Sequence, residues 1–139
     1  MIKLIYLLFL TPIFLTAGLD ISKINTTLES FKFSKPLKFF NADKSIKIKE
    51  NLTLASLDNA DIVLFPKDRK FKKMAIVNSY AALRENKNNI GAIYLRKGRT
   101  QIVFIEERLK SNGLSLPKKY KKYIITECQL NPVCLLELN

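Results

Sequence analysis

The side chains that most often carry out covalent or metal chemistry are scarce in this chain. Among its 139 residues there is no histidine, and the only cysteines are Cys128 and Cys134. Without histidine the chain has no Ser-His-Asp or Cys-His nucleophile system and no histidine-containing zinc site. Two cysteines are also too few for an all-cysteine zinc site or an iron–sulfur cluster. We therefore expect no metal site and no cofactor.

The two cysteines have the spacing of a structural disulfide. They enclose five residues in the sequence CQLNPVC, where Asn131-Pro132 favours a reversal of the chain. A redox-active pair usually has the spacing C-x-x-C near a helix N-terminus, which this pair lacks. In an oxidising compartment we predict a disulfide between Cys128 and Cys134, with two free thiols as the alternative.

The carboxylates give little support to acid–base catalysis. Glu106 and Glu107 are neighbours on a predicted helix, so their side chains point in different directions. The other carboxylates are scattered, and no pair has a spacing that is recognisable for acid–base work. The sequence therefore favours a protein that is not an enzyme.

Positive charge is the most distinctive chemical property of the chain. It has 24 Lys and Arg against 12 Asp and Glu, a formal net charge of +12. Between residues 61 and 100 ten basic residues stand against three acidic ones. A concentrated positive field attracts phosphates, anionic lipid surfaces or acidic protein faces. The alternative is that these lysines and arginines only solvate the surface.

One basic group is predicted at the tip of a β-hairpin. The strand-like runs 90–95 (IGAIYL) and 100–105 (TQIVFI) flank the sequence RKGR, whose glycine suits a positive φ. Three cations on a rigid turn suit docking to an acidic protein, although loop tips are also basic because they are wet. The predicted partner-binding residues are Tyr94, Arg96, Lys97, Gly98, Arg99 and Gln101.

A second polar group follows two predicted parallel strands, 60–65 (ADIVLF) and 74–77 (MAIV). Ligands in open α/β sheets bind at the carboxyl edge of such strands. No P-loop or G-x-G-x-x-G sequence is present, and Ser79 also suits the N-cap of a short helix over 80–86. The predicted anion-binding residues are Lys67, Arg69, Lys70, Asn78, Ser79 and Tyr80.

The other elements complete a small α/β domain. Apolar spacing predicts a helix before Pro36, and the alternation in 45–49 (SIKIK) predicts a strand. A helix over 106–110 should end at Asn112-Gly113, and another should begin at Pro117. The second of these helices carries Lys118, Lys119, Lys121 and Lys122, which suit either an outer face above the sheet or an anionic membrane. We predict a Rossmann-like three-layer α/β domain with a mixed sheet, a C-terminal β-hairpin and C-terminal helices.

The amino terminus has the pattern of an export signal. Residues 1–18 begin with one lysine, continue with an apolar run over 4–15 and end in small residues. The run is about a dozen residues and is broken by Thr11-Pro12, whereas a membrane-spanning helix needs roughly 20 apolar residues. We predict a signal peptide over 1–18 and a single α/β domain over 19–139, located in the periplasm or secreted.

The stretch NNIGAIYLRKGRTQIVFIEERLKSNGLSLPKKY resembles the C-terminal part of the YfiR-like family of periplasmic regulatory proteins. The matching features are Gly91, the turn 97–99, Phe104, Gly113-Leu114 and the helix start at Pro117, where the family has a serine-type start. They cover about half of the chain after the predicted signal peptide. The resemblance implies a periplasmic Rossmann-like domain and, as in the best-known members of the family, a repressor that binds the sensing domain of an inner-membrane diguanylate cyclase.

Together these observations predict an exported regulatory or binding module that acts through protein contact. Its expected partner is an acidic periplasmic or membrane-anchored domain. The alternative is a module that binds a phosphate- or carboxylate-bearing solute, like one lobe of a periplasmic solute-binding protein. Nucleic acid is not an expected partner, because export argues against it and the aromatics are not interleaved with the cations.

Overall fold

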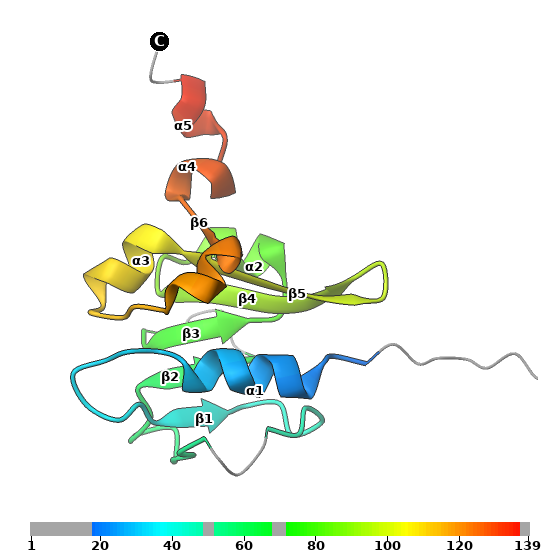
Figure 1. The fold of residues 1–139 in the computed structure, drawn as a ribbon, viewed down its shortest axis with the longest axis vertical. Helices are drawn as coiled ribbons and strands as arrows, with labels where there is room; N and C mark the ends of the chain where they lie inside the picture. Colours follow the sequence, from blue (N-terminus) through cyan, green and yellow to red (C-terminus); the bar gives the residue numbers. More distant parts are fainter. Residues whose placement is uncertain (1–17, 49–51, 68–71, 137–139) are drawn as a thin grey trace, which may run out of the picture.

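The computed structural model describes residues 18–48, 52–67 and 72–136, which form one six-stranded mixed sheet with helices (Figure 1). The predicted α/β class is confirmed. The strands lie side by side in the order in which they occur in the sequence. The predicted signal peptide lies outside the described residues, apart from Gly18.

The elements follow the chain in a simple order. They are α1 (Ile21–Glu29), β1 (Phe39–Asn41), β2 (Ile62–Leu64), β3 (Met74–Val77), α2 (Tyr80–Glu85), β4 (Asn89–Arg96), β5 (Arg99–Ile105), α3 (Glu106–Ser111), the 3-10 helix η1 (Lys118–Tyr123), β6 (Ile124–Ile125), α4 (Glu127–Leu130) and α5 (Val133–Leu136). The first four strands are parallel, β5 is antiparallel to β4, and β6 is parallel to β5. The two apolar runs predicted as parallel strands are β2 and β3, next to each other inside the sheet.

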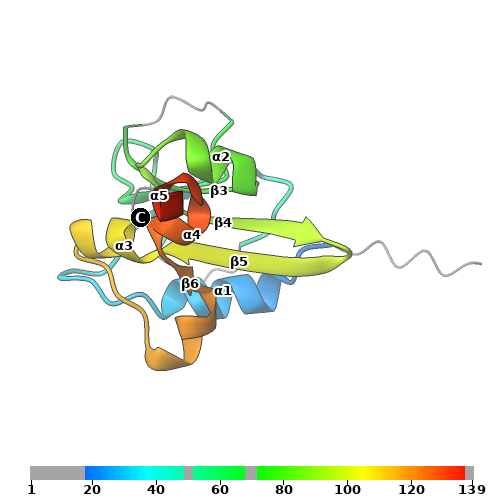
Figure 2. The same ribbon diagram turned by 90° about the horizontal axis from the view of Figure 1, so that it is seen from above.

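Helices cover both faces of the sheet, as the three-layer prediction requires. Ile24 and Leu28 of α1 belong to the larger hydrophobic cluster, on one face. Leu83 of α2 and Leu130 of α4 belong to a smaller cluster on the other face. Seen from above, α1 and α2 lie on opposite sides of β4 and β5 (Figure 2). The sheet therefore presents two different surfaces, each with its own set of side chains.

The β4–β5 hairpin is confirmed, and its turn has the expected geometry. Arg96 pairs with Arg99, so the turn has two central residues, Lys97 with φ 50° and Gly98 with φ 75°. Two successive positive φ angles define a type I′ turn, which matches the twist of the strands. Near the other end of the hairpin, Gly91 pairs with Phe104, and a Cβ atom on Gly91 would overlap the phenylalanine ring.

The predicted strand over 45–49 is wrong for its described part, residues 45–48, which form turn and coil. The Asp43 carboxylate accepts hydrogen bonds from the backbone N–H of Ser45 (3.0 Å) and its hydroxyl (2.6 Å). The Asn41 side chain donates to the Ile46 carbonyl at 2.8 Å. Such side-chain bonds stabilise a turn against extended structure. The edge strand beside β2 is instead β1, which the sequence patterns did not indicate.

The predicted continuous helix from Pro117 is also wrong. The chain forms the six-residue 3-10 helix η1, then strand β6, then α4. The sequence of η1 is KKYKKY, a repeat of three, and a 3-10 helix has three residues per turn. Tyr120 and Tyr123 therefore share one side of η1, and the four lysines occupy the others. Tyr120 is buried, and its hydroxyl lies 2.9 Å from the Ser30 hydroxyl of the segment after α1.

Candidate functional site

The predicted partner-binding residues lie together at the projecting end of the β4–β5 hairpin (Figure 2). Arg96, Lys97, Gly98 and Arg99 are exposed, while Tyr94 and Gln101 are half-buried and pair with each other across the two strands. Within residues 18–48, 52–67 and 72–136, no carboxylate forms an ion pair with any of the three basic side chains. The hairpin tip is thus a cluster of cations without an acidic partner in that part of the chain.

A groove adjoins the hairpin tip on the face of the sheet that α2 and α4 cover. It has a volume of about 510 Å³. Side chains on a strand alternate between the two faces, so Tyr94 and Arg96 of β4 share this face with Gln101 and Val103 of β5. The groove is lined by Tyr80, Tyr94, Arg96, Gln101, Val103, Ile125 and Gln129.

The groove combines three kinds of chemistry. Val103 and Ile125 give it an apolar part, and they pack against the smaller hydrophobic cluster. Two tyrosines supply broad ring surfaces, one of which is covered by Arg84, with its guanidinium carbon 4.9 Å from the Tyr80 ring centre. Gln101 can donate and accept hydrogen bonds, and Gln129, whose Oε1 accepts a hydrogen bond from the Thr126 N–H, keeps its Nε2 as a donor. The groove therefore suits an apolar side chain of a partner protein. The partner's backbone and carboxylates next to that side chain would then contact the polar and basic groups of the groove.

A buried arginine that the sequence did not single out holds the wall of this groove. Arg108 of α3 is 5% exposed and binds Glu127 of α4 through two hydrogen bonds, Nε to Oε1 at 2.6 Å and Nη2 to Oε2 at 3.1 Å. Its Nη1 donates to the carbonyls of Leu83 (2.7 Å) and Asn89 (2.8 Å). Arg108 thus connects α3, α2, β4 and α4, and it positions the segment that carries Gln129.

Two local features stabilise the segment 126–134, which lies next to the groove. Thr126 and Gln129 form a capping box at the start of α4, in which each side chain bonds to the backbone of the other residue. Cys128 and Cys134 form the predicted disulfide, with their Cα atoms 5.4 Å apart, and it joins α4 to α5. This bond is compatible with an oxidising compartment, in which disulfides persist.

The predicted anion-binding residues are only partly brought together. Lys67, Asn78 and Ser79 line one hollow of about 290 Å³ at the carboxyl edge of β2 and β3. The Ser79 hydroxyl accepts a hydrogen bond from the Ala82 N–H at 3.1 Å and caps α2. Tyr80 lines the groove beside the hairpin instead. Arg69 and Lys70 lie outside the described residues.

Two carboxylates also line this hollow, and they change its electrostatics. Asp43 and Glu85 both border it together with Lys67. The hydrogen bonds that Asp43 accepts from Ser45 lower the pKa of its carboxyl group, and the charge of Lys67 contributes in the same direction. Asp43 is therefore ionised at neutral pH. Its negative charge opposes the entry of an anion and partly neutralises Lys67.

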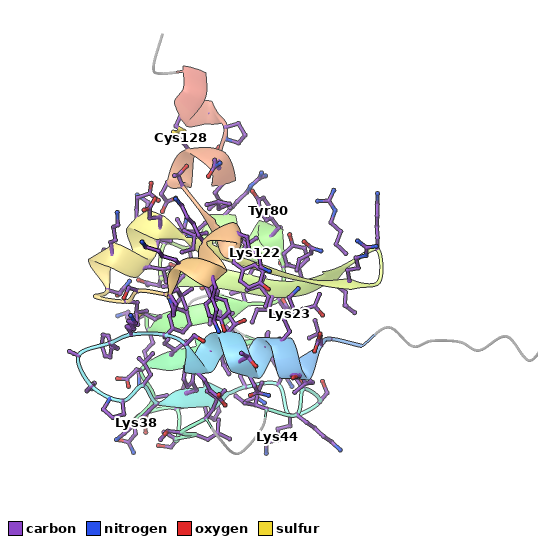
Figure 3. The ribbon with its side chains drawn as sticks, viewed as in Figure 1. Lys23, Lys38, Lys44, Tyr80, Lys122 and Cys128 are labelled. Atoms are coloured by element: carbon purple, nitrogen blue, oxygen red, sulfur yellow. A yellow bond between two sulfur atoms is a disulfide. The ribbon has the colours of Figure 1, made fainter. Side chains whose placement is uncertain are left out.

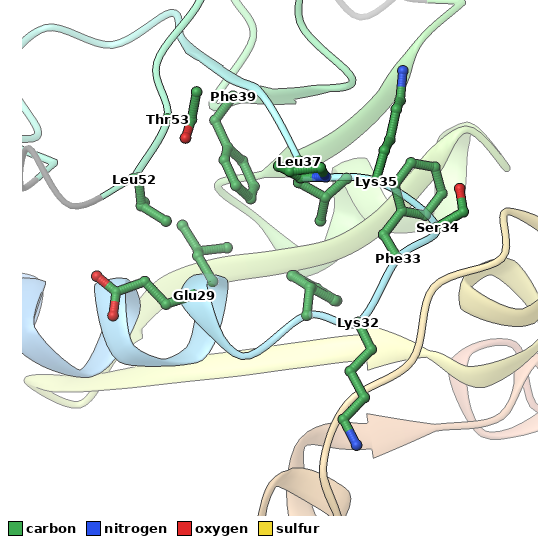
Figure 4. Close-up of a pocket in the computed structure, with 12 residues that line it drawn as sticks. Glu29, Lys32, Phe33, Ser34, Lys35, Leu37, Phe39, Leu52 and Thr53 are labelled. Atoms are coloured by element: carbon green, nitrogen blue, oxygen red, sulfur yellow. The ribbon is translucent and has the colours of Figure 1, made fainter.

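A further hollow, of about 510 Å³, lies between the end of α1 and the start of β1 (Figure 4). Phe33, Leu37, Phe39 and Leu52 contribute apolar surface to it. Lys35 belongs to the same lining and forms an ion pair with Asp61 at 3.2 Å. None of the residues predicted to bind a partner or an anion belongs to this hollow.

Within the described parts of the chain, no helix combines the length and the apolar character needed to cross a membrane. In the same residues, no group of three or more Cys, Asp and Glu side chains is placed to hold a metal ion.

The chain was compared with known protein families, with curated proteins and with solved structures, and none of them matches it. The relationship to the YfiR-like family therefore stays a prediction.

Proposed function

We propose that this protein is an exported, non-catalytic module that binds an acidic protein domain through its hairpin tip and the adjoining groove. The observation that carries the proposal is the set of three exposed cations, Arg96, Lys97 and Arg99, on a type I′ turn with no carboxylate partner among the described residues. The groove beside them adds apolar and aromatic surface in contact range of Arg96.

The residue types support a protein partner. Arginine binds carboxylates with two parallel hydrogen bonds, which adds geometric selectivity to its charge. Tyrosine and arginine are enriched among the residues that dominate binding energy at protein interfaces. The type I′ turn limits the conformations that the tip can adopt, so less entropy is lost when it binds. An acidic surface with one projecting apolar side chain would fit this arrangement.

The proposed compartment and partner rest on different grounds. The leader-like residues 1–18 and the disulfide support export to the periplasm or the cell exterior. The resemblance of residues 88–120 to YfiR-like proteins supports a membrane-anchored sensing domain, such as that of an inner-membrane diguanylate cyclase, as the partner. In this proposal the bound module holds such a domain in one signalling state.

Site-specific cross-linking in cells would test the proposal. A photo-reactive amino acid replaces Gln101 in the full chain, and envelope fractions are searched for one defined adduct. We expect the adduct to disappear in the variant Arg96→Glu/Lys97→Glu/Arg99→Glu. The control Lys44→Glu/Lys47→Glu/Lys87→Glu has the same change in charge at exposed positions and should keep it. If the adduct still forms after the charges of the tip are reversed, the hairpin is not the binding element.

The alternative, a binding site for a small anion at the edge of β2 and β3, has less support. Asp43 places a negative charge in the hollow beside Lys67, and the Ser79 hydroxyl is engaged in capping α2. Differential scanning fluorimetry with phosphate, sulfate and small carboxylates discriminates between the two functions. A ligand that binds only the folded state raises the unfolding midpoint, and a saturable rise that Lys67→Gln abolishes would favour this alternative.

A further inference from the structure

The 3-10 helix η1 presents a second, separate basic surface. Its residues Lys118, Lys119, Lys121 and Lys122, here called the lysine face, are all exposed. The period of three turns Tyr120 and Tyr123 toward the protein, where they pack beside each other with ring centres 6.0 Å apart. The lysine face therefore has no apolar stripe of its own. An amphipathic α-helix, in contrast, would present an apolar stripe next to its lysines.

The tyrosines hold η1 against α1 and so fix the lysine face in place. The Tyr120 hydroxyl lies 2.9 Å from the Ser30 hydroxyl and 3.4 Å from the Thr26 carbonyl. Two cations lie close to Tyr123, with the Lys122 ammonium 5.2 Å and the Lys23 ammonium 5.4 Å from its ring centre. Such cation–π contacts keep positive charge near this surface and do not neutralise it.

The charge of the lysine face is not compensated within the described part of the chain. None of its four lysines forms an ion pair with a carboxylate there. Lys32 adds to the same region, because its backbone pairs with Ser115, shortly before η1. The end of its side chain lies near the segment that leads into η1 (Figure 4). Lys23 and Lys122 lie close together in front of the sheet (Figure 3).

We propose that the lysine face binds the surface of an anionic lipid bilayer. Lysine is a compact, hydrated point charge on a flexible stem, which suits a diffuse negative surface more than a shaped site. Clusters of lysines next to a membrane bind anionic headgroups, and each contributes about a fivefold increase in partitioning. Lysine is depleted in protein–protein interfaces, so a protein partner fits this surface less well.

The bilayer contact is independent of the proposed function of the hairpin. Seen from above, η1 and the hairpin tip point in different directions, so occupation of one leaves the other accessible (Figure 2). A protein held at a bilayer by its lysine face could still contact a membrane-anchored partner with its hairpin. Either contact can fail in an experiment while the other is retained.

Vesicle sedimentation tests the inference with the full chain in every arm. The vesicles contain either phosphatidylcholine alone or phosphatidylcholine with phosphatidylglycerol, at low and at high salt. The apolar run over 4–15 carries no charged residue, so the difference between the two lipid compositions is used to report the charge-dependent part of binding. We expect stronger binding to the anionic vesicles at low salt and a large loss of that preference at high salt, because salt screens exposed charges.

Two variants locate the effect. The variant Lys118→Gln/Lys119→Gln/Lys121→Gln/Lys122→Gln should weaken binding to anionic vesicles by several hundredfold, because each of the four lysines contributes about fivefold. The matched control Lys44→Gln/Lys47→Gln/Lys72→Gln/Lys87→Gln removes the same charge from exposed positions elsewhere and should weaken it far less. Replacement of the four η1 lysines by arginine should preserve binding, because the charge is retained.

Three outcomes would overturn the inference. Equal losses in the η1 variant and the control would show attraction by net charge alone. Equal binding to neutral and anionic vesicles would show that lipid charge is not recognised. Binding to polyglutamate but not to anionic vesicles would assign the face to an acidic protein, provided that the η1 variant loses this binding and Arg96→Glu/Lys97→Glu/Arg99→Glu keeps it. Thermal unfolding of each variant verifies that the compared proteins are folded.

Discussion

The hairpin tip and the lysine face carry similar charge, yet the chain builds them in different ways. The tip consists of two arginines and one lysine on a two-residue turn that extends from a paired β-ribbon. The lysine face consists of four lysines on one short 3-10 helix, held by two inward-facing tyrosines. The tip borders a groove with aromatic and amide groups, whereas the tyrosines beneath the lysine face are directed into the protein.

The difference shows that net charge alone does not identify a partner. Arginines with fixed spacing beside an apolar groove favour a shaped, acidic protein surface. Lysines on an exposed turn favour an extended negative surface, for which the exact position of each charge matters less. We therefore expect a mutation in one region to change the stability or the binding of that region and to leave the binding of the other region unchanged.

The largest effect should come from Arg108, on which the groove depends and the lysine face does not. Arg108→Leu leaves Glu127 without its partner and removes the donor of the Leu83 and Asn89 carbonyls. The Glu127 side chain is 37% exposed and can be solvated, whereas the Leu83 and Asn89 carbonyls lose a buried donor. Because each buried group left without a hydrogen bond costs about 1–3 kcal/mol, we expect a loss of about 3 kcal/mol of unfolding free energy. Urea denaturation measures this loss, and Lys110→Ala, which removes an exposed pair with Glu106, should cost only about 0.5 kcal/mol.

The same variant also separates the two binding regions. In Arg108→Leu we expect weaker cross-linking from Gln101, because α4 loses the contact between Arg108 and Glu127 that helps to hold it beside the groove. The charge-dependent vesicle binding should persist, since η1 is held by α1 through Tyr120. A parallel loss of both activities in protein that is still folded would contradict the separation of the two regions.

The turn of the hairpin should give the next largest effect. Gly98 has φ 75°, so Gly98→Ala forces an L-residue with a side chain into the left-handed region and destabilises the fold by about 1 kcal/mol. Lys97, at φ 50°, is also left-handed, and Lys97→Asn should stabilise the turn because asparagine tolerates this conformation. Thermal unfolding should therefore shift in opposite directions for the two variants. A shift in the same direction would show that the turn geometry does not control stability here.

The attachment of η1 can be tested by removing one hydroxyl group. Tyr120→Phe loses the contact with the Ser30 hydroxyl and should cost about 1 kcal/mol of unfolding free energy. Tyr123→Phe is the matched control, because no hydrogen bond of its hydroxyl group is among those found in the described residues. Chemical denaturation measures both, and equal stabilities would show that the Tyr120 hydroxyl does not anchor η1. Cross-linking from Gln101 should be unchanged in either variant.

Much of the central fold could be predicted because its signals are local. The buried runs of β2 and β3 are apolar on both faces, and the β4–β5 hairpin has a glycine where the turn needs a positive φ. The edge strands were missed for a physical reason. β1 has three residues and β6 has two, so neither shows a periodic pattern, and each is defined by hydrogen bonds to a distant partner strand.

The candidate site shows the same division between local and distant signals. The basic tip was predicted from the sequence RKGR, whereas the groove needs α2, β6 and α4 to meet beside the hairpin. Arg108 could not be singled out, because its partners Leu83 and Glu127 lie 25 and 19 residues away. The 3-10 helix had a local signal, the period of three in KKYKKY, which was interpreted with α-helical spacing instead.

The smallest expected effect is a change in the pKa of Asp43, which lines the same hollow as Lys67. Lys67 therefore has a carboxylate nearby, whereas the basic residues of the tip and the lysine face form no ion pair within the described residues. The bonds from Ser45 hold the pKa of Asp43 below its ordinary value of 3.8, and Lys67 adds to this. A carboxyl group whose pKa is lower in the folded state stabilises the fold above the unfolded-state pKa. The stabilisation from Asp43 is therefore lost as the pH falls from about 5, past the ordinary pKa of 3.8, toward the lower pKa of the folded state.

Ser45→Ala removes the hydroxyl donor and should raise the pKa of Asp43 toward its ordinary value. Lys67→Gln should raise it less, because the hydrogen bonds from Ser45 are the larger cause. NMR titration of the Asp43 carboxyl carbon measures both shifts, and Ser22→Ala, remote in sequence, is the control. If Lys67→Gln had the larger effect, charge pairing would dominate at this edge. Lys67 would then differ even more strongly from the unpaired cations of the tip and the lysine face.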